Sequence, residues 1–212
     1  MADAASALLR DFGTTAGPPA NVLFRLTMRY ATACTAIHVC LRPIVRRMPR
    51  VARKFHGDFL NRVVATLHAV VVSVACTRAL IVEQPFADAW TSAMTLAGGD
   101  VNFFAGHSRT LDFVLPISLG YFLYDAVLML LDREIYMFAM MLHHVGALVT
   151  WPIAYLSDTH HFYLLYLLTT ELSSPFLHQA VFFLPTLGLK GRPIHTFCGL
   201  ALLVLFLVVR IL

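Results

Sequence analysis

The residues of this chain that could carry out chemistry are ionisable and aromatic side chains set in long apolar stretches. Asp125 lies nine residues before Glu134 and His143 nine residues after it, on two stretches that a short turn connects. Because a helix rises about 1.5 Å per residue, Asp125 and His143 would lie at the same depth and could meet across a helical hairpin. A histidine beside a carboxylate can act as a general base or as a nucleophile. We therefore predict that His143 or His144 is catalytic, with Asp125 orienting the imidazole. Tyr121, one helical turn before the aspartate, would hydrogen-bond a reacting carbonyl.

Other polar side chains are expected at similar depths, where they would contact a ligand. His68 lies about eight residues into an apolar stretch, and His178 lies about eight residues before Thr186, at the end of another. Glu171, Ser174 and His178 recur at intervals of three and four residues, which places them on one helix face. These residues are predicted to extend the polar layer around the catalytic group.

An ion pair between Glu171 and Arg210 is predicted deeper in the membrane than this layer. Glu171 lies nineteen residues before Lys190 and Arg210 lies twenty residues after it, so opposite charges would share one depth. A charge at the bilayer centre costs roughly 2.5–3.5 kcal/mol, so such groups usually have partners. Pro175 leaves the carbonyl of Glu171 without a donor, which predicts a bend there. Because polar residues also hold membrane helices together without catalysis, a structural role for all these residues stays open.

The elements that must position these residues are transmembrane helices. The 212-residue chain is 58% hydrophobic and 13% charged, and its mean hydropathy is +0.72. A soluble domain is roughly 45–50% apolar and 25% charged, so this composition excludes a soluble globular protein. Six apolar stretches are each long enough, or nearly so, to cross a bilayer. They are Phe24–Leu41, Leu60–Val82, Leu111–Leu131, Tyr136–Leu156, Phe162–Leu184 and Ile194–Leu212.

The distribution of basic residues predicts how the chain crosses the membrane. Seven of the 16 Lys and Arg residues lie between Arg42 and Arg62, whereas Arg109 is the only one between Glu83 and Thr110. The positive-inside rule therefore places the first loop in the cytoplasm. No aromatic or Gly-rich pattern accompanies the basic residues, so nucleic acid is not an expected partner. Arg25 lies in the first stretch, which is either a short span or an interfacial helix.

Neither metal chemistry nor a disulfide framework is predicted. Cys34, Cys40, Cys76 and Cys198 lie in apolar stretches without C-x-x-C spacing. A di-iron hydroxylase would need several H-x-x-H-H boxes, and the chain has only the isolated pair of His143 and His144 in such a stretch. The first 21 residues lack the basic start and apolar run of a cleavable signal peptide.

Three blocks of residues resemble the signature of TLC-domain proteins. They are Gly-Tyr-Phe-Leu-Tyr-Asp at 120–125, His-His at 143–144 and Glu-Leu-Ser-Ser-Pro-Phe-Leu at 171–177. The resemblance runs from Phe55, through Asn-Arg at 61–62 and Thr-Leu-His at 66–68, to Arg210. It divides the chain into an N-terminal segment, residues 1–54, and a TLC-like transmembrane domain, residues 55–212.

The resemblance implies an all-α, polytopic membrane protein whose helices form a barrel around a lipid-sized cavity. In that family another helix usually follows the one with the matching arginine, but this chain stops two residues after Arg210, which predicts an incomplete barrel. Ceramide synthases of the family carry His-Asp where this chain has Thr170 and Glu171, and Asp where it has Ser174. The chain also lacks their homeobox-like segment, so it resembles the small TLC-domain-containing proteins more closely.

The predicted function is accordingly lipid metabolism or membrane lipid homeostasis in the endoplasmic reticulum, with acyl transfer as the candidate reaction. The substrate would then be acyl-CoA, and no cofactor is expected. A non-catalytic lipid-binding, sensing or trafficking protein is the alternative. Expected partners are membrane lipids and not nucleic acid, and a homo-oligomer is compatible with these features.

Overall fold

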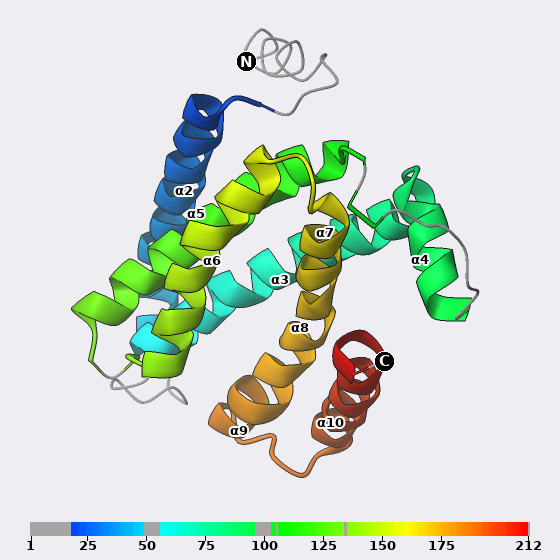
Figure 1. Cartoon of the computed structure of the whole chain (residues 1–212). Coiled ribbons are helices and arrows are strands. Elements are labelled where there is room, and N and C mark those ends of the chain that lie inside the picture. Colours follow the sequence, from blue (N-terminus) through cyan, green and yellow to red (C-terminus); the bar gives the residue numbers. More distant parts are fainter. Residues whose placement is uncertain (1–17, 49–55, 96–102, 105, 134, 212) are drawn as a thin grey trace, which may run out of the picture.

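Long helices make up most of the chain (Figure 1). The computed structural model describes residues 18–48, 56–95, 103–104, 106–133 and 135–211. Within these ranges helices and their short 3-10 or π extensions are the only regular secondary structure. The all-α class predicted from the sequence is confirmed. The boundary predicted at residue 54, residues 49–55 of the basic loop and the turn residue Glu134 lie outside the described ranges.

Four helices are long and apolar enough to cross a membrane. They are α3 (His56–Val82), α5 (Arg109–Leu131), α6 (Phe138–Leu156) and the segment Pro193–Ile211, which comprises α10 (Pro193–Phe206) and a final π turn. Each coincides with one of the six predicted stretches. The first predicted stretch lies in α2 (Ala20–Arg46), a 27-residue helix that is not among these four.

The fifth predicted stretch is helical but not one continuous α-helix. It consists of α7 (His161–Thr169), a 3-10 turn at Thr170–Ser173, α8 (Ser174–Leu177), a π turn at His178–Phe183 and α9 (Leu184–Thr186). Pro175 has no backbone N–H to donate to the preceding turn. The change of helix type therefore falls at Glu171 to Ser174, where the sequence predicts a bend.

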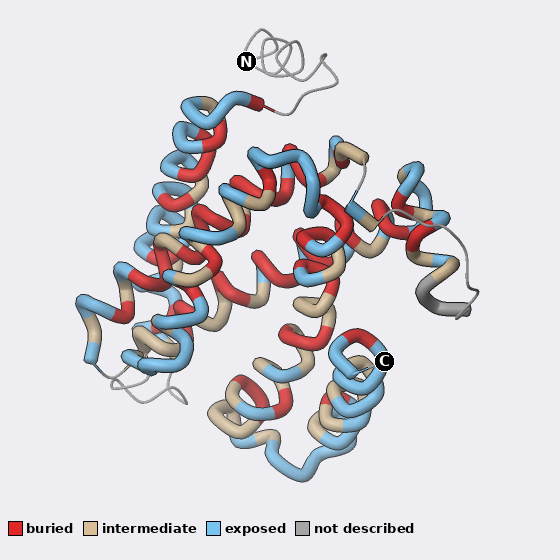
Figure 2. Tube along the Cα trace, viewed as in Figure 1, coloured by how far each residue is buried: buried red, intermediate tan, exposed pale blue. Residues whose placement is uncertain are grey.

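The core lies where α3, α5 and α7 meet. α3 packs against α2, α5 and α7 and against the short helix α4 (Phe86–Thr95). Leu80, Leu115 and Leu165 are almost fully buried in this cluster. Figure 2 shows buried residues concentrated at this junction, whereas α10 is mostly exposed. An exposed apolar face is what a helix in contact with lipid presents, because hydrocarbon replaces water there.

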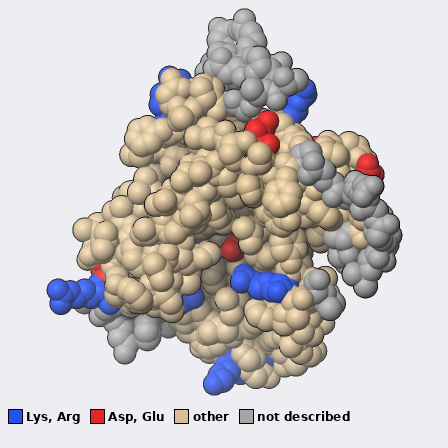
Figure 3. Space-filling view, viewed as in Figure 1, with Lys and Arg blue, Asp and Glu red and all other residues tan. Residues whose placement is uncertain are grey.

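The chain turns alternate between two ends of the molecule. At one end, Gly57 at the start of α3 approaches Asp132 and Ile135 in the turn between α5 and α6. At the other end, His107 before α5 contacts Asp158 between α6 and α7. Figure 3 shows that most of the visible face is uncharged, with charged side chains mainly around its rim and one acidic and one basic group close to each other near its middle. This arrangement is that of a multi-pass membrane protein.

Candidate functional site

A buried carboxylate and imidazole form the centre of the candidate site. Asp125 of α5 and His144 of α6 have exposed fractions of 4% and 1%. His144 Nδ1 lies 3.0 Å from Asp125 Oδ2, within ion-pair distance, although the angle is outside that of a hydrogen bond. The amide nitrogen of Asn61 in α3 donates to Asp125 Oδ1 over 2.6 Å. The carboxylate is thus held between α3 and α6, and its position is set by three helices.

The neighbouring histidine, His143, points elsewhere. Its residue is exposed, and its ring centroid lies 5.5 Å from that of His144 and 6.0 Å from that of Phe122. The expected meeting of Asp125 with His143 is therefore corrected to one with His144. Successive helical residues point about 100° apart, so only one histidine of the pair can face α5.

His68 and Tyr121 complete the inner polar layer. Their rings stack with centroids 4.3 Å apart and planes 17° apart, and both residues are buried. His68 Nε2 lies 3.2 Å from the hydroxyl of Ser118. The Tyr121 ring also meets that of His144, with centroids 5.9 Å apart. Three of the predicted residues on separate helices, His68, Tyr121 and His144, are therefore in one aromatic cluster beside Asp125.

His178 belongs to a different set of contacts. Its Nδ1 lies 2.8 Å from the hydroxyl of Thr66 on α3, and Thr66 also donates to the carbonyl of Arg62. Thr66 is only two residues from His68, so the predicted depth of His178 agrees with its contact. His178 therefore fastens the π turn to α3 and is not hydrogen-bonded to Asp125 among the described residues.

The predicted ion pair between Glu171 and Arg210 is not formed. Glu171 Oε2 accepts the hydroxyl of Ser174 over 2.7 Å, and Arg210 Nε donates to the hydroxyl of Ser173 over 3.1 Å. Ser173 ends the 3-10 turn and Ser174 begins α8, whereas Arg210 lies in the π turn at the end of the described chain. Matching depth alone did not capture these changes of helix type. Arg210 lines an apolar pocket of about 360 Å³ between the 3-10 turn and α10.

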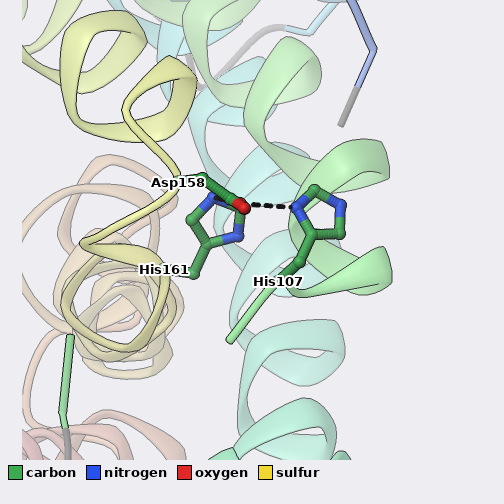
Figure 4. A group of neighbouring side chains, drawn as sticks. All are labelled: His107, Asp158 and His161. Carbon is green, nitrogen blue, oxygen red and sulfur yellow. Dashed lines mark hydrogen bonds and ion pairs between the residues drawn. The ribbon is translucent and has the colours of Figure 1, made fainter. Parts of the chain in front are cut away.

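A second polar cluster, at the opposite end of the molecule, was missed from the sequence. His107 Nδ1 contacts Asp158 Oδ1 over 2.9 Å, and His107 Nε2 lies within about 3 Å of the carboxylate of Asp112. His161 Nε2 lies 3.3 Å from Asp158, and Tyr155 donates to Asp112. Figure 4 shows His107, Asp158 and His161 directed toward one another from two neighbouring turns. The available signal was the absence of Lys and Arg from residues 157–161 and the single Arg109 in residues 83–110, a charge pattern that places both connections on the side of the membrane opposite the basic loop.

The ligand atoms of His107, Asp158 and His161 are close enough to hold a metal ion, within 4.8 Å of one another. The hydrogen bonds of His161, however, favour a ring that does not bind a metal ion. The backbone N–H of Ser108 donates to His161 Nδ1, so a neutral His161 ring carries its proton on Nε2. That nitrogen faces the carbonyl of Tyr155 at 3.2 Å and has no lone pair for a metal. His107, Asp158 and His161 are therefore members of a hydrogen-bond network and not metal ligands.

His107 has carboxylates at both ring nitrogens, which favours its charged form. Burial lowers the pKa of His107, but the hydrogen bonds to Asp112 and Asp158 outweigh burial and raise the pKa. A protonated ring donates from both nitrogens. His107 is thus suited to act as a cationic clamp between the start of α5 and the turn after α6.

Comparison with known proteins identifies the family. The model of the TLC domain matches residues 58–212, well over half of the chain. The chain belongs to the TLC-domain family. It is similar to TLC domain-containing protein 4 A of Dictyostelium discoideum, with 26% identity over 157 residues, 72% of this chain and 55% of that protein. The chain thus spans about half the length of this curated relative, and no solved structure matches.

The family match confirms the resemblance predicted from the three sequence blocks. It begins at Asp58, so all but the first two residues of α3 and all later helices lie in the matched region, and α2 precedes it. The residues of the Asp125 layer and Arg210 are all within the match. The TLC domain, together with four apolar helices, establishes a membrane protein.

Proposed function

We propose that this TLC-domain protein acts on a membrane lipid, in lipid metabolism or membrane lipid homeostasis, and that Asp125 with His144 forms the centre of its site. The supporting observation is the burial of this pair within an apolar helical domain. Removing an ionisable pair from water costs free energy, so stability alone is a poor reason to place one there. In the membrane such residues are by default candidates for function.

The reaction that this geometry supports best is acyl transfer from acyl-CoA to an amine or hydroxyl acceptor. Asp125 would hold the His144 ring with Nδ1 toward the carboxylate, which leaves Nε2 to accept the proton of the acceptor. The acceptor would then attack the thioester carbonyl, the C–S bond would break, and the thiolate would leave as CoA. Tyr121, whose ring meets His144, would donate to the carbonyl oxygen.

A specific observation favours a second function, lipid binding without catalysis. His144 has an exposed fraction of only 1%, whereas a general base must reach its substrate. In this alternative the buried layer holds the helices in place, and the exposed His143 contacts a lipid head group. His68, Glu171, Ser174, His178 and Arg210 would then serve as ligand contacts or helix fasteners.

Labelled acyl-CoA distinguishes the two functions. The purified full chain is incubated with labelled acyl-CoA and candidate amine or lysolipid acceptors, beside His143→Ala, His144→Ala and a control, His160→Ala. His160 is exposed at the opposite end of the molecule, where it lies beside Thr159. The catalytic proposal expects product from the wild type and the control, and a loss of about 10²-fold or more without the base. Equal product from all samples removes the catalytic assignment. No product from any sample, with lipid retention reduced only by His143→Ala, supports the binding function.

We also propose the endoplasmic reticulum as the compartment.

A further inference from the structure

An open groove lies between α2 and α5, on the outside of the helices that hold the Asp125 layer. It has a volume of about 540 Å³ and is lined by α2 between Met28 and Arg42 and by α5 between Leu123 and Leu131. α2 lies outside the region that the TLC-domain model matches. Tyr121, Asp125 and His144 do not line the groove, so it is separate from the site proposed above, and about half of its wall comes from α2.

The wall of the groove is suited to hydrocarbon. The hydroxyl groups of Thr32 and Thr35 donate to backbone carbonyls one turn earlier on the same helix, those of Met28 and Ala31. Their hydrogen-bond donors are therefore satisfied without a ligand. His38 Nδ1 lies 2.7 Å from the Tyr124 hydroxyl across the groove. Val127 and Leu131 are large apolar side chains exposed at this surface. With its polar groups already paired, the middle of the groove offers mainly van der Waals contact.

Arginine side chains mark one end of the groove. Arg42 lines it and is exposed, and Arg46 follows one helical turn later on the same face of α2. Neither arginine is in an ion pair among the pairs found in the described ranges. An apolar groove that ends at two such cations matches an amphipathic anion. The positive-inside rule places this end at the cytoplasmic surface, where anionic phospholipids are abundant.

The length of the groove agrees with one acyl chain. Fourteen residues of α2 separate Met28 from Arg42, a rise of about 21 Å. The eight residue steps from Leu123 to Leu131 on α5 rise about 12 Å. One leaflet of the hydrocarbon core is about 15 Å thick, half of the roughly 30 Å total. A chain lying in the groove would therefore extend from the bilayer middle to the arginines.

We propose that the groove between α2 and α5 binds an anionic phospholipid, with one acyl chain along the groove and the phosphate at Arg42 and Arg46. This site differs from the Asp125 layer in position and chemistry, because it requires a cation at a membrane surface and no buried acid or base. It does not depend on the proposed reaction.

Native mass spectrometry of the purified full chain tests the site. The delipidated protein is titrated with phosphatidylserine or phosphatidylcholine of identical acyl chains, and with inorganic phosphate alone. We expect retention of phosphatidylserine in preference to phosphatidylcholine, and none of phosphate. Arg42→Gln should weaken phosphatidylserine binding about fivefold, the effect of one basic residue near an anionic surface. Arg192→Gln is the matched control, because Arg192 is also exposed but lies in the connection before α10.

A second pair of variants tests the groove itself. Thr35→Trp places a large ring in the groove, whereas Ala36→Trp, at the next residue, projects from a position that does not line it. We expect only Thr35→Trp to abolish retention, and His144→Ala to leave it unchanged. Equal binding of both phospholipids would overturn the proposal, as would equal effects of the two arginine variants. Equal retention by the two tryptophan variants would exclude this groove as the site.

Discussion

Replacing Gly120 by alanine should separate α2 from α5, because the two helices touch at this residue. A Cβ atom at Gly120 would lie 2.6 Å from the Cβ of Tyr30, 2.8 Å from the backbone nitrogen of Ala31 and 2.9 Å from the carbonyl oxygen of Thr27. A Cβ atom essentially never lies within 3.0 Å of an atom to which it is not bonded. Two of the three neighbours are backbone atoms, so no side-chain rotation relieves the contact. α2 must therefore move as a unit.

The size of the effect follows from two opposing contributions. Alanine is about 1 kcal/mol more favourable than glycine within a helix. Overpacking a close contact typically costs about 1–3 kcal/mol. Gly146→Ala in α6 is the matched control, since nothing lies within 4 Å of its added Cβ. Gly146→Ala gains the helix propensity of alanine without the steric clash. The free energies of unfolding of the two variants should therefore differ by about 1–3 kcal/mol.

Thermal unfolding in one detergent, followed by intrinsic fluorescence, measures this difference. For a chain of this length each kcal/mol shifts the midpoint by about 2–4 °C. Gly120→Ala should therefore melt about 2–12 °C below Gly146→Ala. If Gly120→Ala melts at or above the control, α2 does not pack against α5 at this position, and the groove between them loses its structural basis.

Two further predictions concern charged groups. The pKa of His107 is raised by its carboxylate partners, so its protonated form stabilises the fold. That stabilisation is fully present below the unfolded-state pKa of about 6.5 and is lost as pH rises through the higher folded-state pKa. The thermal unfolding midpoint should therefore decrease as the pH rises above about 6.5. An unchanged pH dependence of the midpoint in His107→Gln would contradict the clamp. For Glu171 and Arg210, which bond to Ser174 and Ser173 and not to each other, each leucine variant should cost about 1–3 kcal/mol. The double variant should be less stable than either single variant, and recovery of stability in the double variant would restore the ion pair predicted from depth.

Much of the fold could be predicted because apolar length is a local property of the chain. Four of the six predicted stretches are helices long and apolar enough to span a bilayer, and the family predicted from blocks at 120–125, 143–144 and 171–177 is confirmed. Backbone groups in hydrocarbon must bond within their own helix, so a long apolar stretch has few alternatives to helix. A break in the regular α-helix before Pro175 was also predictable, since proline removes a specific backbone donor, and a 3-10 turn lies there.

The pairing of side chains depended on tertiary structure. Counting residues placed Asp125 at the depth of both His143 and His144, but the rotation of α6 about its axis decides that His144 faces the carboxylate. Asn61, which holds the other carboxylate oxygen, comes from α3, and no spacing relates it to α5. Similarly, His107 and Asp158 are 51 residues apart and meet only because two turns converge.

The sequence by itself determined that this protein is a helical membrane protein with a TLC domain, because hydropathy, charge distribution and short motifs are carried by residues near one another in the chain. Tertiary structure decided which imidazole meets Asp125, that Glu171 and Arg210 have separate serine partners, and that α2 and α5 enclose an apolar groove. Each of these depends on the rotation and local pitch of helices. A depth estimate of about 1.5 Å per residue contains neither quantity, since it describes position along the helix axis and not direction around it.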